Sequence, residues 1–142
     1  MAKNYDPRMH TAEHILNQTM DRLFACGRCF SAHVNPDKAK CDYHYDRDLT
    51  EDEARDVEAR VNAVIAADLP VFVEKMARSE AEALFNLDRL PDGASEELRI
   101  IRIGDYDACP CIGEHVDRAR RLLHMLHRGV VMAGQGQAAL AA

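Results

Sequence analysis

The sequence lacks a long apolar run, since none of its segments approaches the roughly 20 apolar residues that a membrane-spanning helix requires. Its first ten residues, MAKNYDPRMH, also lack the apolar core of a secretory signal peptide. We therefore expect a cytoplasmic protein without a membrane partner. The 142 residues allow one hydrophobic core but not two comfortable ones, so we expect a single domain over residues 1–142.

An excess of positive charge is missing as well. The formal net charge is -6, which argues against a protein that holds nucleic acid by overall electrostatic attraction. The segment after residue 116 is the exception, because it carries four arginines against one aspartate. Any nucleic-acid partner must therefore be recognised locally. Apolar residues make up 47% and charged residues 30%, a balance typical of a globular protein.

Five cysteines are an odd number, and in a reducing cytoplasm thiols serve metals or chemistry more often than disulfides. Cys26 and Cys29 form a Cys-x-x-Cys unit, which would hold a second structural ion only if Cys41 and His44 joined it. We expect these thiols to line a pocket or the core instead. His33 and His44 flank a predicted hairpin turn and are expected at the surface.

The pattern of apolar residues predicts an α+β fold in which a mostly antiparallel sheet packs with two main helices. The first helix is expected over residues 10–24, and the second follows Thr50, which forms a capping box with Glu53, and ends before Pro70. The further predictions are a hairpin over 29–45, a strand over 71–76, a short capped helix over 79–85, a turn over 91–93 and a strand over 98–103. Residues 117–129 have helical character, and the last nine residues look loose.

Two pairs of side chains suit a metal ion. His10 and His14 stand four residues apart on the first predicted helix, so both imidazoles lie on one face. Cys111 and His115 repeat this spacing much later in the chain. Either pair alone is weak evidence for a metal site. A His pair at this spacing is usually an accident of composition, and a lone cysteine is more often a buried apolar residue. Together they predict one tetrahedral Zn2+ site of three imidazole nitrogens and one thiolate.

The stretches His10-Thr-Ala-Glu-His14-Ile-Leu and Cys111-Ile-Gly-Glu-His115-Val resemble the HxxxH and CxxxH signatures of alanyl-tRNA synthetase editing domains and their free-standing relatives. The region between them agrees with that family in order and length. The matching framework consists of the helix after Thr50, Asn62, Leu69-Pro70-Val71, Glu80-Ala81 and Arg102-Ile103. The resemblance covers about Met9 to Val116 and implies a synthetase editing-domain-like fold.

By this resemblance, the protein would remove serine, or glycine, from mischarged tRNA(Ala) in trans. The implied zinc ligands are His10, His14, Cys111 and His115. Glu13 departs from the small or polar residue common in the family, and Phe30 lies near a position where the family has glutamine. Both departures bear on which amino acid is removed. Residues 117–142 also diverge from the closing strands of the family, and we interpret them as a diverged terminus or a change of reading frame.

Glu13 and Glu114 each stand beside an implied ligand, so either is a candidate general base for an attacking water. The alternative is that Glu13 is a solvated helix carboxylate and that Glu114 orients a histidine. Four protein ligands close the shell of a zinc ion. Either one ligand gives way to water or substrate, or the ion anchors the amino acid and shapes the pocket.

Two other functions are open from the sequence. His10-x-x-Glu13-His14 also spells the inverted zinc-hydrolase motif, and the same helix with a downstream cysteine resembles the lyase that acts on S-ribosylhomocysteine. Both of these enzyme classes use three protein ligands. A zinc-stabilised module that binds tRNA without hydrolysing it is the alternative that is not an enzyme.

Overall fold

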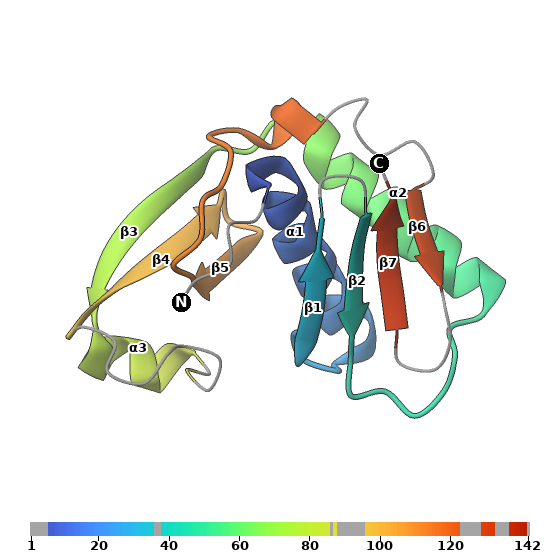
Figure 1. Ribbon diagram of the computed structural model, residues 1–142, viewed down its shortest axis with the longest axis horizontal. Helices are drawn as coiled ribbons and strands as arrows, with labels where there is room; N and C mark the ends of the chain where they lie inside the picture. The colour runs from blue at the N-terminus through green and yellow to red at the C-terminus, as the bar shows by residue number, and fades with distance from the viewer. Residues whose placement is uncertain are drawn as a thin grey trace.

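The computed structural model describes residues 6–35, 38–85, 87, 96–122, 129–132 and 137–141. It confirms the α+β class and divides the strands between two antiparallel sheets. The larger sheet has the order β1-β2-β7-β6, formed by Ser31–Val34, Lys38–Asp42, Gln137–Ala141 and Gly129–Met132. The smaller sheet has the order β3-β4-β5, formed by Val71–Ala77, Glu97–Ile103 and Asp107–Pro110. The first helix lies between the two sheets (Figure 1).

This helix, α1 (Pro7–Phe24), begins three residues earlier than predicted. The Asp6 carboxylate accepts hydrogen bonds from the backbone N–H groups of Arg8 and Met9, and a proline occupies the first turn, so the start is well capped. Every residue from Met9 to Asn17 is buried. The predicted metal donors of α1 therefore lie in the interior of the protein.

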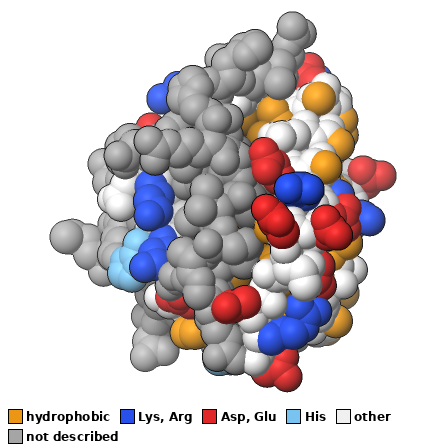
Figure 2. All heavy atoms as spheres, turned by 90° about the vertical axis from the view of Figure 1, so that its right-hand side faces the viewer, with side chains coloured by type: hydrophobic (Ala, Val, Ile, Leu, Met, Phe, Trp, Pro, Cys, Tyr) orange, Lys and Arg blue, Asp and Glu red, His pale blue; other side chains and the backbone are white. Residues whose placement is uncertain are grey.

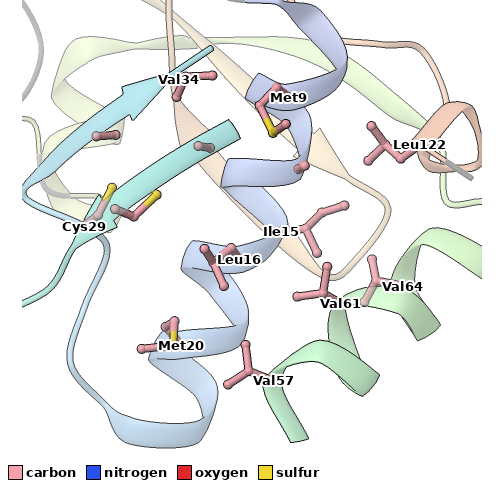
Figure 3. Close-up of a cluster of buried hydrophobic side chains, with 14 of the residues drawn as sticks. Met9, Ile15, Leu16, Met20, Cys29, Val34, Val57, Val61, Val64 and Leu122 are labelled. Carbon is pink, nitrogen blue, oxygen red and sulfur yellow. The ribbon is translucent and has the colours of Figure 1, made fainter. Parts of the chain in front are cut away.

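The second helix, α2 (Glu51–Ala66), packs against α1. Its predicted capping box is confirmed: the Glu53 N–H donates to Thr50 Oγ1 at 3.1 Å, and the Thr50 N–H donates to Glu53 Oε1 at 2.9 Å. Figure 3 shows the contact between the two helices in the main core. It joins Ile15, Leu16 and Met20 of α1 with Val57, Val61 and Val64 of α2. This packing fixes the position of α1.

The predicted hairpin is present, with β1 and β2 paired from Ser31↔Asp42 to Val34↔Ala39. Residues 36–37 of its turn lie outside the described residues, as does the turn predicted over 91–93. His33 and His44 are exposed, as expected.

In the smaller sheet, β3 and β4 pair along their whole lengths, and α3 (Arg78–Leu84) follows β3 directly. The expected side-chain cap of this helix is wrong, since its first turn has no such hydrogen bond. Strand β5 was not predicted, because it is short and ends at Pro110. It leads straight to Cys111, one of the predicted metal donors. None of the described helices is long and apolar enough to span a membrane.

The structure corrects the expectation for the end of the chain, since the segment that looked loose forms β7. Of the helical stretch expected over residues 117–129, residues 123–128 lie outside the described part of the chain, and its described part contains one 3-10 turn, η1 (Ala119–Leu122). β7 pairs with β2 from Lys38↔Ala141 to Asp42↔Gln137, and β6 pairs with β7. The edge of β2 thereby gains backbone partners, and this nonlocal pairing overrides the weak local pattern.

Candidate metal centre

The two predicted pairs of metal donors converge in the structure. His10, His14, Cys111 and His115 each offer one donor atom, and these atoms all lie within 4.8 Å of one another. The ring of His115 is 4.2 Å from that of His10 and 4.5 Å from that of His14, measured between centroids. α1 supplies the first pair, and the loop after β5 supplies the second. Gly113 lets this loop approach α1, because a Cβ there would overlap the His10 imidazole.

Thr11 fixes the protonation of His115. The Thr11 hydroxyl donates its proton to the Pro7 carbonyl at 2.9 Å, so it acts as an acceptor toward Nδ1 of His115 at 3.0 Å. Nδ1 of His115 therefore carries the ring proton, and burial lowers the pKa of this imidazole to about 4. Its Nε2 is left as a buried acceptor that makes no hydrogen bond. A metal-binding imidazole has this arrangement.

His10 and Cys111 face each other across the cluster. Nδ1 of His10 lies 3.2 Å from the Glu114 carbonyl oxygen, to which it donates, and this leaves Nε2 at 3.5 Å from Cys111 Sγ. Burial raises the pKa of the Cys111 thiol, but its interactions with the three surrounding histidines, His10 first, outweigh burial and lower that pKa to about 3. The site therefore favours a thiolate, the form that binds zinc.

Two buried carboxylates flank His14. Asp107 Oδ2 lies 3.7 Å from Nδ1 of this ring, and Glu13 Oε2 lies 3.6 Å from Nε2. Burial lowers the pKa of His14, but Asp107, Cys111 and Glu13 outweigh burial and raise it well above its usual value. Nδ1 is buried and makes no hydrogen bond. The two carboxylates thus set the orientation and the basicity of a candidate ligand.

Asp107 is itself held in place by two donors. Arg28 donates to its two oxygens at 2.7 and 3.3 Å, and Gln18 donates to Oδ1 at 2.9 Å. Burial raises the pKa of Asp107, but its electrostatic interaction with His14 and the charge of Arg28 outweigh burial and lower it to about 2. The sequence analysis missed both residues of this ion pair. The sequence did contain a signal for this pair: Asp107 is an acidic residue four positions before Cys111, and it follows the apolar segment predicted as a strand over 98–103.

The two candidate bases lie in different surroundings. Glu13 is only 4% exposed, which contradicts the alternative of a solvated helix carboxylate. Asn17 Nδ2 and the Cys29 thiol donate to its Oε1 at 3.1 and 3.4 Å. Glu114 is exposed, and its main-chain carbonyl is the group that contacts His10. Of the two carboxylates, only that of Glu13 is therefore buried beside the donor cluster.

The Cys-x-x-Cys unit does not converge on one ion. The Cys26 thiol contacts backbone carbonyl groups, whereas the thiols of Cys29 and Cys41 lie within 4.8 Å of each other and of a Glu13 oxygen. His44 is exposed and does not join this group. Of the Cys-x-x-Cys pair, Cys29 is buried in the core and Cys26 packs against it partly buried, so the expectation that these two thiols line a pocket or the core is confirmed.

The four donors fit a zinc ion. Imidazole nitrogen and thiolate sulfur are both usual ligands of tetrahedral zinc, and Mg2+ or Ca2+ would instead require oxygen ligands. The buried Nε2 of His115, an acceptor that makes no hydrogen bond, is available to such an ion. His115 belongs to the same cluster as the other three donors, whereas an HxxEH-type site would use three protein ligands.

Comparison with known proteins finds relatives of this chain. No family model matches the chain. It is 35% identical over 123 residues to the alanine–tRNA ligase of Caldivirga maquilingensis, covering 81% of this chain and 14% of that enzyme. It is 30% identical over 115 residues to the alanyl-tRNA editing protein AlaX-L of Pyrococcus horikoshii, covering 81% of this chain and 28% of that protein. The chain thus spans less than a third of either relative, and it is a homologue of the alanyl-tRNA synthetases and of an alanyl-tRNA editing protein.

Proposed function

We propose that this protein removes serine, or glycine, from mischarged tRNA(Ala), acting in trans at a zinc ion held by His10, His14, Cys111 and His115. The observation that carries the proposal is the convergence of these four donors from two separate motifs. The homology to a protein named for alanyl-tRNA editing supports the same activity. We place the reaction in the cytoplasm, where tRNA is charged.

Hydrolysis of an aminoacyl ester requires little from the protein beyond positioning the reacting groups. An aminoacyl ester is already reactive, so the site must place a water at the carbonyl carbon and stabilise the negative oxygen that develops. Zinc would supply polarisation of the carbonyl or of water. A closed shell of four ligands implies that one gives way, or that the ion anchors the amino acid.

Glu13 is the residue that we assign as general base. Its carboxylate is buried beside His14, and Asn17 and Cys29 hold Oε1 in a fixed orientation. Glu114 is the second candidate. Its carbonyl orients His10, and its exposed carboxylate would need to turn inward to reach the water.

Two rival functions make different predictions. An HxxEH-type hydrolase or lyase would need a fourth position open to water, and His115 argues against it by lying in the cluster with a buried, unbonded Nε2. A zinc-stabilised module that only binds tRNA would keep the metal site and lack hydrolysis.

The deciding experiment measures deacylation of tRNA(Ala) charged with serine, glycine or alanine. We expect zinc-loaded protein to release serine or glycine and to spare alanine. The Cys111→Ala variant should lose bound zinc and activity, whereas Cys26→Ala, which removes another partly buried thiol outside the cluster, should keep both.

Folded, zinc-loaded protein that hydrolyses none of the three substrates would contradict the proposal and indicate a binding module. Full activity in Cys111→Ala would exclude the site itself.

A further inference from the structure

A second feature of the surface is an aromatic hollow near the metal cluster. Phe30 is 51% exposed although it is a large apolar residue, and its ring stacks on His44 with centroids 4.3 Å apart and an interplanar angle of 22°. The two rings open onto a hollow of about 510 Å³. We call it the aromatic hollow; it is lined by Phe30, Tyr43, His44, Tyr45 and Asp46.

The aromatic hollow is connected to the metal cluster by short contacts. Cys29 directly precedes Phe30, and its thiol lies 3.4 Å from Oε1 of Glu13. The other oxygen of Glu13 lies 3.6 Å from Nε2 of His14. Tyr43, which also lines the hollow, donates from its hydroxyl to the side chain of Asn17 in α1 at 2.7 Å. These contacts link the lining of the hollow to Glu13 and Asn17 of α1, the helix that carries the first pair of donors.

Basic side chains lie farther along the same hairpin. His33 of β1 and Lys40 of β2 are register partners on its outward face, and Lys38 follows on that face toward the turn. Asp42 occupies the end of this face that is nearer the hollow. Figure 2 shows Lys or Arg side chains beside a His side chain on the left of its view, whereas acidic and basic side chains are mixed on the right. Phosphate groups would be attracted to the basic end of this face although the whole chain is acidic.

We propose that the aromatic hollow binds the terminal adenine of the tRNA acceptor end, stacked on Phe30 beside His44. Unpaired bases are bound in this way by aromatic side chains, because every base offers a flat π face. In the terminal nucleotide, the base is joined directly to the ribose that carries the aminoacyl ester. A base in the hollow would therefore present the ester to the adjacent donor cluster, while the preceding phosphates follow the basic end of the hairpin. This inference rests on the proposed function.

The test uses an RNA microhelix whose unpaired 3′ end carries 2-aminopurine in place of the last adenine. Stacking quenches its fluorescence, so titration of the zinc-loaded protein measures binding at the hollow. Phe30→Leu keeps an apolar side chain but removes the π face, and we expect binding roughly ten-fold weaker. Phe30→Tyr should bind like the unmodified protein. Phe72→Leu is the matched control, since Phe72 is 44% exposed on β3 of the other sheet.

Kinetics with the mischarged microhelix give an independent readout. Phe30→Leu should raise KM by a similar factor and leave kcat nearly unchanged, because the substitution removes a binding contact and not a reacting group. Equal binding by the Phe30→Leu and Phe72→Leu variants, with Cys111-dependent hydrolysis intact, would overturn this inference and leave the proposed function standing. Quenching that depends on Phe30 in a protein that hydrolyses no charged tRNA would support the base-binding hollow and overturn the proposed function.

Discussion

The Thr11 hydroxyl joins the two halves of the metal centre, because it accepts a hydrogen bond from Nδ1 of His115 at 3.0 Å and another from the Val116 N–H at 3.2 Å. Thr11 belongs to α1, which supplies the first pair of donors, and His115 completes the second pair from 104 positions later in the chain. A single oxygen atom thus fixes both the position of the loop after β5 and the protonation of one candidate ligand.

Replacing this hydroxyl should weaken metal binding. Thr11→Val keeps the branched shape but leaves two donors without an acceptor, so we expect zinc affinity to fall about 10- to 100-fold and the free energy of unfolding to fall by about 1–3 kcal/mol. Competition with a chromogenic chelator and urea unfolding measure the two effects. Thr11→Ser keeps the hydroxyl and should leave zinc affinity unchanged, although loss of the buried methyl group should itself cost about 1 kcal/mol of stability. Equal zinc affinity in both variants would show that Thr11 does not orient His115.

The assignment of the general base is tested by Glu13→Gln. This change keeps the size of the side chain but removes its ability to accept a proton, so we expect kcat to fall by about 10²- to 10⁴-fold in zinc-saturated protein. Glu114→Gln is the matched control and should leave kcat unchanged, because this side chain is exposed. If Glu13→Gln loses zinc in proportion to activity, its carboxylate acts only by orienting His14, which lies 3.6 Å away.

Local patterns predicted the four clustered donors and the capping box of α2, but they did not predict pairings between distant parts of the chain. His10 with His14 and Cys111 with His115 follow from helical or short-range spacing, and so does the Thr50 capping box. The Arg28–Asp107 ion pair joins residues 79 positions apart, and a local sequence pattern cannot reveal a contact between residues so far apart in the chain. β7 is a similar case, because its alanine-rich sequence has little intrinsic preference for a strand and pairs where the edge of β2 offers partners.

The Arg28–Asp107 pair should contribute far more stability than an exposed pair. The Asp107 side chain is fully buried and that of Arg28 is 28% exposed, so Asp107→Asn leaves a largely enclosed guanidinium without its counter-charge. We expect a loss of about 3 kcal/mol in the free energy of unfolding. Asp68→Asn breaks the exposed pair with Arg118 and should cost less than about 1 kcal/mol. Similar losses in the two variants would show that burial does not strengthen the Arg28–Asp107 pair.

Removing the metal should lower thermal stability. Without an ion, the buried Nδ1 of His14 and Nε2 of His115 lack hydrogen-bond partners. A ligand that binds only the folded state contributes about 2.7 kcal/mol at a free concentration 100 times its Kd. We therefore expect added zinc to raise Tm and a chelator to reverse the rise, as followed by calorimetry. Cys111→Ala should show a much smaller response than Cys26→Ala, and equal responses would place the ion elsewhere.

The start of α2 should make stability depend on pH in the acid range. Hydrogen bonds from Arg47 and from the Thr50 N–H lower the pKa of Glu53 to about 2, against an ordinary value of 4.5. Because the folded-state pKa is depressed, this contribution is fully present above about pH 4.5 and is lost as the pH falls toward 2. Urea unfolding should therefore show a difference in the free energy of unfolding between the unmodified protein and Glu53→Gln that is largest near neutral pH and shrinks in acid.

Glu51→Gln is the control. It changes a carboxylate that is 86% exposed in the same turn, and it should give a small difference in the free energy of unfolding at every pH. A Glu53→Gln difference that stays constant with pH would mean that its ionised carboxylate does not stabilise the cap.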